Sequence, residues 1–292
     1  MKVDKPLFEP TTKMNHAEWL QSRRKGIGGS DVAAILGMSP WRSPYSVWAD
    51  KTGRLPLNEA GNEFTHWGTI MEPILAHEFE DVTGKKVYRQ NKTYFDPAHP
   101  YLRANIDRDI AGEPGFLEIK TATEYKSDEW EDDKVPEPYL YQVQHYMYVL
   151  NRPYVYFAYL VGGHHFDFKR VERDQEAIDF VEPYLIDWWE RHVIGDVPPD
   201  TDGSNATTRA LRELYPEDDG EVVPLGGEYN TLLVNREALK SSMATTKEEL
   251  DAIDNKLRAD IGEATAGETG EWLVTNKTNK RGARSLRIKH KK

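Results

Sequence analysis

The run Phe116-Leu117-Glu118-Ile119-Lys120 places two charged residues inside an apolar segment. A short apolar run that follows a turn-forming sequence, here GEPG, is typical of a buried strand. Side chains alternate along a strand, so Glu118 and Lys120 project to one side with Phe116, while Leu117 and Ile119 project toward the core. A carboxylate and an ammonium side by side on such a strand need a partner or a function, and this requirement constrains the fold around them.

Short segments of strand and helix character surround this run. Residues 86 to 122 read as short strands separated by turns, whereas the segments before and after them show the three- and four-residue apolar spacing of helices. Strands are predicted at 87–96, 101–110, 115–123 and 153–163, and helices just after Ser30 and at 45–51, 66–84, 139–151 and 175–195. This order predicts an α/β fold with a mixed central sheet flanked by helices.

A domain boundary is predicted in the segment 196–221, where Pro, Asp and Gly accumulate. We therefore expect one domain at residues 1–220 and an accessory module at 221–292. Within the module, residues 229–263 have the spacing of a helical arm or short coiled coil. The chain closes with a predicted hairpin, and its last 16 residues, 277–292, carry eight Lys or Arg and no acidic residue.

The overall charge and composition exclude several classes of protein. With 49 acidic and 38 basic residues, the net charge of −11 argues against a protein that coats nucleic acid through its overall charge. The chain has no cysteine, which excludes disulfides, thiolate zinc sites and iron–sulfur clusters. No stretch approaches the ~20 apolar residues of a membrane span, and the N-terminus lacks a signal-peptide pattern. We expect an intracellular protein with no membrane partner.

Asp107 supplies a second carboxylate near Glu118. It lies on the preceding predicted strand, and a turn folds that strand back alongside the next one, which brings the two carboxylates close together. Asp109, nine residues before Glu118, is the competing partner. We favour Asp107, because the alternation in Asn105-Ile106-Asp107 turns Ile106 inward. Two carboxylates at close range repel each other unless a cation lies between them.

Carboxylate oxygens suit Mg²⁺ or Mn²⁺, which bind through one or two carboxylates, water and a substrate phosphate. With Lys120 beside the carboxylates, the group would place or deprotonate a metal-bound water for in-line attack on phosphorus. These residues predict metal-assisted hydrolysis of a phosphodiester. The alternative is an exposed edge strand on which Glu118 and Lys120 form an ordinary surface ion pair, because the Asp…Glu-x-Lys pattern is short and frequent.

Two residues on predicted helices fit the same site. Glu72 lies three residues before Leu75 and seven before Phe79, which places its carboxylate on the apolar face of its helix. A metal or a metal-bound water would satisfy a carboxylate there, and a first-turn glutamate favoured by the helix dipole is the alternative. Gln142 lies on the tyrosine-lined face of the helix at 139–151, where ordinary core packing, with its amide bonded to backbone, is the alternative.

The N-terminal segment RRKGIGGSD combines Arg23 and Ser30, seven residues apart, in a glycine-rich turn. The chain order of Arg23, GIGGSD, SPW, GTIMEP, NID, LEIK and YLYQVQ resembles the YqaJ-type viral recombinase family, which includes the phage lambda exonuclease and belongs to the PD-(D/E)XK nuclease superfamily. The resemblance covers roughly residues 15–200 and does not reach the C-terminal arm. Ile106 in NID stands where the superfamily has a proline, a position that supplies shape and no ligand.

The resemblance implies a PD-(D/E)XK core, a restriction-endonuclease-like mixed sheet with flanking helices. By the same resemblance, Asp107, Glu118 and the backbone carbonyl of Ile119 would hold Mg²⁺, and Lys120 would orient the attacking water. Glu72 matches the helix glutamate of the family, which we assign to the metal site. Gln142 matches the glutamine of the family's YxxQ motif.

A site for a DNA end is also implied by the resemblance. Arg23 and Ser30 match the pair that grips the terminal 5′-phosphate in the family, and Arg42 would assist them. From the residues alone, the preferred interpretation is a helix-capping turn with surface arginines, in which Ser30 or Asp31 caps the following helix.

The expected function is that of a phage or prophage exonuclease in the cytoplasm of a bacterial host. It would require Mg²⁺, with Mn²⁺ as a substitute, and would degrade double-stranded DNA from 5′ ends, leaving a 3′ strand for an annealing protein. The family implies a ring-shaped homo-oligomer. A structure-specific endonuclease with the same site is the second interpretation, and a non-catalytic DNA-binding scaffold is the third.

Overall fold

The structure is a computed structural model that describes residues 5–57, 63–132 and 134–291. The chain divides into two compact units, Met1–Asp218 and Asp219–Lys292. The boundary expected from the sequence lies two residues beyond this division. Within the described ranges, no helix combines the length and the apolar character that crossing a bilayer would need.

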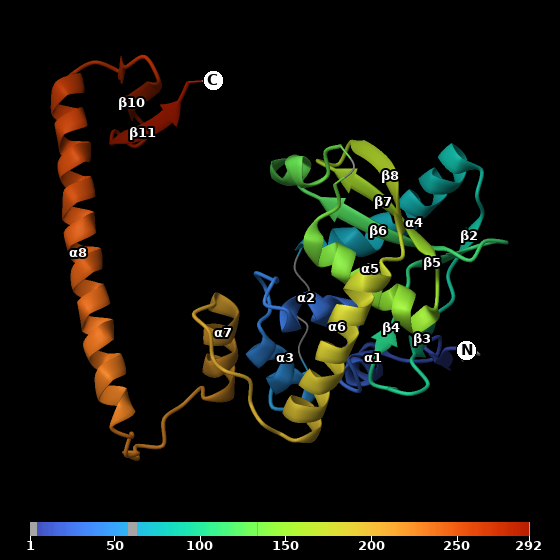
Figure 1. Cartoon of the computed structure of the whole chain (residues 1–292). Helices are drawn as coiled ribbons and strands as arrows, with labels where there is room; N and C mark the ends of the chain where they lie inside the picture. The colour runs from blue at the N-terminus through green and yellow to red at the C-terminus, as the bar shows by residue number, and fades with distance from the viewer. Residues whose placement is uncertain (1–4, 58–62, 133, 292) are drawn as a thin grey trace. The chain divides into compact units, whose positions relative to one another are not determined.

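A five-stranded sheet forms the centre of the first unit (Figure 1). In spatial order its strands are β2 (Val87–Tyr88), β5 (Arg108–Ile110), β6 (Phe116–Ala122), β7 (Tyr154–Val161) and β8 (His165–Glu172). β6 and β7 are parallel, and the other neighbouring pairs are antiparallel. The helix α5 (Glu137–Leu150) lies in the connection between the two parallel strands, as a parallel pair requires. The predicted mixed α/β fold is confirmed.

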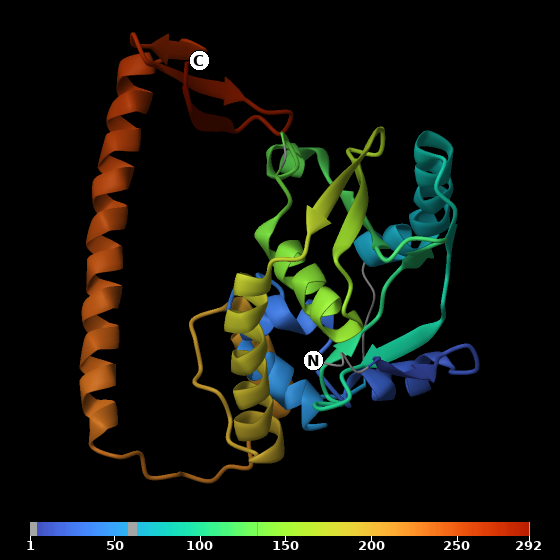
Figure 2. The same cartoon turned by 45° about the vertical axis from the view of Figure 1, so that its right-hand side comes forward.

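Helices cover both faces of this sheet (Figure 2). On one face, α4 (Glu63–Thr83, cyan) packs Phe79 into a cluster with Leu117 of β6. On the other face, the fully buried ring of Phe116 lies beside Tyr146 of α5, with ring centroids 6.4 Å apart. The expectation that β6 turns only its Leu117 side toward a core was therefore incomplete. β6 is a central strand, and helices bury it from both sides.

A smaller sheet changes the interpretation of two predicted strands. It consists of β1 (Leu7–Pro10), β3 (Lys92–Phe95) and β4 (Arg103–Ala104), all antiparallel. The predicted continuous strands at 87–96 and 101–110 are wrong, because each is divided between the two sheets. Asn91 has a φ of 50° at the first break, in the left-handed region that asparagine tolerates. At the second break the side chain of Asn105 donates to Thr93 Oγ1 at 2.8 Å.

Polar caps determine where several helices begin. Asn15 and Glu18 form a reciprocal capping box at the start of α1 (His16–Arg23), with hydrogen bonds of 2.8 and 2.9 Å. Ser43 caps α3 (Pro44–Lys51), whose first residue is a proline. The remaining α-helices of the unit are α2 (Gly29–Ile35), α6 (Gln175–Trp188) and α7 (Asn205–Leu214).

The C-terminal part of the first unit differs from the prediction in two ways. The helix expected at 175–195 consists of α6 followed by a π-helical turn, Trp189–Ile194, and Pro183 lies in the interior of α6. The boundary segment 196–221 contains α7, which buries Ala206 and Ala210. Tertiary contact with α3 stabilises this short helix within a segment that reads as irregular in sequence.

The second unit consists of one long helix and a small sheet. α8 (Glu228–Ile261) has 34 residues. The sheet is antiparallel, with β10 (Trp272–Thr278) between β9 (Ala266–Glu268) and β11 (Arg284–His290). The predicted hairpin corresponds to β10 and β11, and β9 adds a third strand that the sequence interpretation missed.

Candidate active site

Asp107 and Glu118 lie opposite each other beside the β5–β6 pair. In this antiparallel ladder Arg108 pairs with Leu117. Continuing the same register by one residue places Asp107 opposite Glu118. Oδ2 of Asp107 accepts a hydrogen bond from the backbone N–H of Ile119 at 2.7 Å. Burial, together with the charge of Glu118, raises the pKa of Asp107 well above its usual range. The structure thus brings together the two carboxylates that the sequence pairs.

Lys120 and Gln142 form a hydrogen-bonded group with Glu118. Lys120 Nζ lies 2.8 Å from Glu118 Oε1, and the Gln142 side-chain amide donates to the same oxygen at 2.6 Å. Lys120 Nζ also donates to Gln142 Oε1 at 3.3 Å. Burial by itself would lower the pKa of Lys120, but the charges of Glu118 and Asp107 outweigh burial and raise it. Lys120 is therefore an ammonium group, suited to holding a water or phosphate oxygen and not to removing a proton.

The two carboxylate oxygens of Glu118 differ in their hydrogen bonding. Oε2 is buried and has no hydrogen-bond partner among the described residues, although Oε1 has two. A buried carboxylate oxygen without a partner is costly, and a divalent cation beside it would remove that cost. In the part of the chain that the structure describes, no three Asp, Glu or His side chains group together as a metal site. The carboxylates of Asp107 and Glu118 are the oxygen donors at this position that could hold a cation.

Glu72 has a protein partner that the sequence interpretation did not foresee. Its Oε1 forms a short ion pair with Arg108 NH1. Arg108 is therefore a protein partner of Glu72, and the assignment of Glu72 to the metal site stays a prediction. Arg108 pairs with Leu117 in the ladder, so it lies on the sheet face that α4 covers. After burial and Glu118, the charge of Glu72 also contributes to the raised pKa of Asp107, so Glu72 lies within electrostatic range of the site.

Asp109, the competing carboxylate, is bound elsewhere. Its Oδ1 lies 3.0 Å from Arg152 NH2, and its Oδ2 accepts a hydrogen bond from the Gln90 side chain at 2.5 Å. Both oxygens are occupied by protein groups, in contrast to the free oxygen of Glu118. The geometry favours Asp107 as the partner of Glu118.

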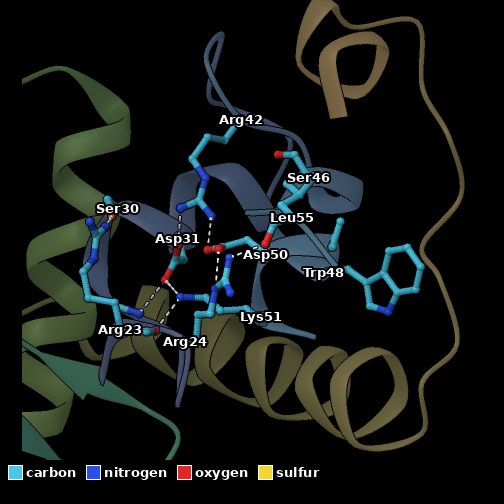
Figure 3. Close-up of polar contacts among 12 residues, drawn as sticks. Arg23, Arg24, Ser30, Asp31, Arg42, Ser46, Trp48, Asp50, Lys51 and Leu55 are labelled. Atoms are coloured by element: carbon cyan, nitrogen blue, oxygen red, sulfur yellow. Dashed lines mark hydrogen bonds and ion pairs between the residues drawn. The ribbon is translucent and has the colours of Figure 1, made fainter. Parts of the chain in front are cut away.

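Arg23 and Ser30 lie side by side at a pocket (Figure 3). Arg23 NH2 donates to Ser30 Oγ at 3.1 Å, and the two residues line a pocket of about 210 Å³. The Arg23 guanidinium also lies over the ring of Trp19, 4.9 Å from its centroid. A guanidinium and a hydroxyl at one pocket offer the donors that a phosphate group accepts.

Asp31 is the centre of a buried ion cluster next to this pocket (Figure 3). Its Oδ2 lies 2.7 Å from Lys51 Nζ and accepts the backbone N–H of Gly28 at 2.9 Å, while Arg42 forms a short ion pair with Oδ1. Lys51 Nζ also donates to the backbone carbonyl of Arg23 at 2.8 Å. The cluster thus fixes the two backbone segments that form the pocket. Burial by itself would raise the pKa of Asp31, but the charge of Lys51 and of the two arginines outweighs it and lowers the pKa.

Arg42 is held differently from Arg23. Besides its ion pair with Asp31, its NH2 lies 3.3 Å from Asp50 Oδ2. It lines a neighbouring pocket of about 510 Å³, which Arg23 also lines. Arg42 therefore contacts Asp31 of the α2 turn, and two carboxylates share its charge.

The phosphate-sized pocket and the carboxylate group meet at the start of α2. A Cβ atom on Gly29 would lie 2.5 Å from Cγ of Gln142 and 2.7 Å from the ring of Tyr146. Tyr146 also lines the pocket of Arg23, and its hydroxyl accepts a hydrogen bond from Gln142 at 3.4 Å. Only glycine permits this close approach, which joins the two parts of the candidate site.

Sequence reasoning missed Arg108 and Lys51, and it named Asp31 only as a candidate helix cap. The two-residue alternation along the strand could have placed Arg108 on the face opposite Asp107. Asp31 does cap the start of α2, through the Gly28 N–H, and its ion pairs are the part that the sequence did not show. No sequence signal pairs Lys51 with Asp31, because they lie 20 residues apart on different helices.

Comparison with known sequences gives two matches that span much of the chain. The model of the YqaJ-like viral recombinase domain matches residues 18–153. The protein YqaJ of Bacillus subtilis (strain 168) is 37% identical over 264 residues, which are 89% of this chain and 83% of that protein. The matched region contains the pocket residues, both carboxylates, Lys120 and Gln142.

Two solved structures are similar at lower identity. One is the alkaline exonuclease LHK-Exo from Laribacter hongkongensis, with 19% identity and a TM-score of 0.49, covering 76% of this chain and 98% of that one. The other is a phage-related exonuclease from Haemophilus somnus, with 11% identity and a TM-score of 0.48, covering 59% of this chain and 96% of that one. TM-scores below 0.5 are too low to assign a fold or an activity from these structures.

Proposed function

The chain belongs to the YqaJ-like viral recombinase family, and from this premise we propose that it is a nuclease that hydrolyses phosphodiester bonds of double-stranded DNA from the ends. The observation that carries the proposal is the group of buried Glu118 with half-buried Asp107 and Lys120. It combines facing carboxylates with an ammonium on adjacent strands of a mixed sheet, the arrangement that the PD-(D/E)XK resemblance implies.

The metal in this proposal is Mg²⁺, or Mn²⁺ in its place, held by Asp107, Glu118 and the carbonyl of Ile119. The free, buried Oε2 of Glu118 supports this assignment. A divalent ion there would polarise a phosphate oxygen and supply an activated water. Lys120 would orient the attacking water and stabilise the negative charge that develops on the phosphoryl oxygens. Gln142 would hold Lys120 and Glu118 in place through its hydrogen bonds.

The pocket of Arg23 and Ser30 supports the direction of digestion that we propose. The Arg23 guanidinium and the Ser30 hydroxyl would bind the terminal 5′-phosphate, which places a 5′ end next to the carboxylate group. Each cleavage would then release nucleotides from the 5′ strand and leave a 3′ single strand. Arg42 would support this pocket through Asp31.

The biological setting that we propose follows the family. The exposed 3′ strand would be passed to a phage single-strand annealing protein, in the cytoplasm of a bacterium that carries the phage or prophage. A ring-shaped homo-oligomer around the DNA would keep the enzyme on its substrate without the tight phosphate contacts that slow movement.

The decisive experiment is digestion of a linear duplex in Mg²⁺ with either 5′-phosphate or 5′-hydroxyl ends, labelled at the 5′ or 3′ terminus. We expect faster digestion of the phosphorylated ends and early release of the 5′ label. Lys120→Ala should reduce the rate by a factor of about 10² to 10³. The matched control is Lys86→Ala, which removes a lysine whose side chain is 74% exposed, and it should leave the rate unchanged.

Two outcomes would reject parts of the proposal. Unchanged turnover in Lys120→Ala would show that the carboxylate group is not the active site. Efficient cleavage of closed circular DNA would assign an endonuclease. Arg23→Ala tests the 5′-phosphate pocket separately from the carboxylate group. This variant should lose the preference for a 5′-phosphate and still cleave slowly.

A further inference from the structure

The helix α8 carries two rows of residues that repeat every seven positions. Among its described residues none is buried, although many are apolar. The first row is Tyr229, Arg236, Met243, Leu250 and Leu257, and the second row is Leu232, Leu239, Thr246, Ile253 and Asp260. The second row follows the first by three residues, so the two rows form one stripe, which we call the seam.

The seam is too apolar and too long for a solvated helix. Leu239 and Met243 are 66% and 72% exposed, and Leu250 and Ile253 are each 57% exposed. The helix is about 50 Å long at about 1.5 Å per residue. A strict seven-residue repeat matches the 3.5-residue period at which two helices stay in contact along their length, whereas packing on a globular core does not need that period.

We propose that the seam is an interface between two copies of this chain, in which two α8 helices pair antiparallel about their midpoints. The midpoint of the 34-residue helix lies between Ala244 and Thr245. Pairing about it places Leu239 against Leu250 of the second copy and Leu232 against Leu257. The two helices then overlap along their entire length, and the contact is identical for both copies, as a two-fold dimer requires.

The polar residues of the seam favour the antiparallel direction. In a parallel, in-register pair, each seam residue meets its own copy, so Arg236 would lie against Arg236 of the second copy. In the antiparallel pair, Arg236 faces Ile253 of the second copy, and its aliphatic stem packs there while the guanidinium reaches solvent. Thr246 meets Met243, so no two like charges oppose each other within the seam.

The charges beside the seam favour the same direction. Lys240 and Asp254 both follow a second-row residue directly, so they flank the seam on the same side. Antiparallel pairing brings Lys240 of each copy toward Asp254 of the other, which creates two opposite-charge contacts. In the same register Lys247, which follows Thr246 of the second row, meets Lys247 of the other copy in one like-charge contact. Parallel pairing would instead bring Glu249 toward Asp254 of the second copy, and these are like charges.

Sedimentation of the full chain tests the interface. The wild type should form an assembly with an even number of copies, and Leu239→Glu with Leu250→Glu should halve its mass, because this variant sets two glutamates against each other in each of two layers. The matched control, Ser241→Glu with Asn255→Glu, adds the same charges to the face opposite the seam and should leave the mass unchanged. All four positions are exposed, so circular dichroism should show unchanged folding.

Single cysteines test the direction, since the chain has no native cysteine. Leu239→Cys and Leu250→Cys proteins, mixed and oxidised, should form the mixed disulfide, and neither alone should crosslink efficiently. Crosslinking of Leu239→Cys with itself would overturn the antiparallel arrangement. A monomeric wild type, or an unchanged mass in the double glutamate variant, would overturn the interface itself. This inference does not depend on nuclease activity.

Discussion

Lys51 Nζ lies 2.7 Å from Asp31 Oδ2, with side chains that are 1% and 2% exposed. Removing one charge from such a pair leaves the other buried and uncompensated. We predict that Asp31→Asn lowers the free energy of unfolding by about 3–5 kcal/mol, as measured by denaturant unfolding. The double variant Asp31→Leu with Lys51→Met should lose less than the sum of the single losses, and strict additivity would contradict the pairing.

The close contact at Gly29 predicts a catalytic defect from a single methyl group. Gly29→Ala would place a Cβ 2.5 Å from Cγ of Gln142, so Gln142 must move and release Glu118 and Lys120. We expect cleavage to fall by at least about tenfold, and binding of a 5′-phosphate end to weaken as well, because Gly29 and Tyr146 line the pocket of Arg23. Steady-state cleavage and a binding assay in Ca²⁺ would separate the two effects.

Gly68→Ala is the matched control for that experiment. A Cβ on Gly68 would meet only Thr121 Oγ1, at an ordinary distance of 3.7 Å. Its activity should therefore remain near that of the wild type. Equal activity of Gly29→Ala and Gly68→Ala would contradict the role assigned to the Gly29 contact.

The raised pKa of Asp107 predicts that replacing its carboxylate makes the metal-free protein more stable, although the replacement abolishes cleavage. The folded state holds this proton more tightly than the unfolded state, so the metal-free protein loses stability as the pH rises above about 4. Asp107→Asn removes that loss. At neutral pH with a chelator, thermal unfolding of Asp107→Asn should occur at a higher temperature than that of the wild type, although cleavage is abolished.

Mn²⁺ gives a second measurement on the same variant. The wild type should gain thermal stability on addition of Mn²⁺, because a cation between Asp107 and Glu118 relieves their repulsion, and Asp107→Asn should gain much less. Asp109→Asn is the control, since it loses an ion pair with Arg152 and should be less stable with or without metal. An equal gain from Mn²⁺ in Asp107→Asn and the wild type would remove Asp107 from the metal site.

The buried pair of His145 and Glu182 predicts a pH dependence elsewhere in the unit. His145 Nδ1 lies 3.0 Å from Glu182 Oε1, and Nε2 lies 3.0 Å from the backbone carbonyl of Arg103. Burial by itself would lower the pKa of His145, but Glu182 outweighs burial and raises it. The stability contributed by this pair is therefore present below the unfolded value of about 6.5 and lost as the pH rises through the raised folded value.

Thermal unfolding across that pH range tests the prediction. The difference in melting temperature between the wild type and His145→Gln should be largest at pH values below about 6.5 and should shrink as the pH rises. His77→Gln, which replaces a histidine with a 71% exposed side chain, is the control and should change the melting temperature only slightly. A difference that grows with pH for His145→Gln would mean that the pKa of His145 is lowered.

Sequence and structure contributed differently to the candidate site. Alternation along a strand is a local property, and it is enough to place Glu118 with Lys120. Asp107 and Asp109 have the same alternation, and only the structure distinguishes them, because Arg152 and Gln90 occupy the oxygens of Asp109. The face of α5 that carries Gln142 is likewise set by helical spacing. These residues could therefore be named before any coordinates were known. In the structure Glu118, Lys120 and Gln142 are hydrogen-bonded to one another, and Asp107 lies opposite Glu118 and accepts the Ile119 N–H.

Other features depend on which elements pack together, and a sequence does not state this. Glu72 forms its ion pair with Arg108 because α4 packs on the sheet. Lys51 is buried against Asp31 because α3 packs on α2. The division of two predicted strands between two sheets has the same origin, because each strand pairs with another strand that can lie far away in the sequence. Side-chain periodicity thus determined which groups face the site, whereas long-range packing decided which of them are neutralised by protein and which oxygen of Glu118 is buried without a partner among the described residues.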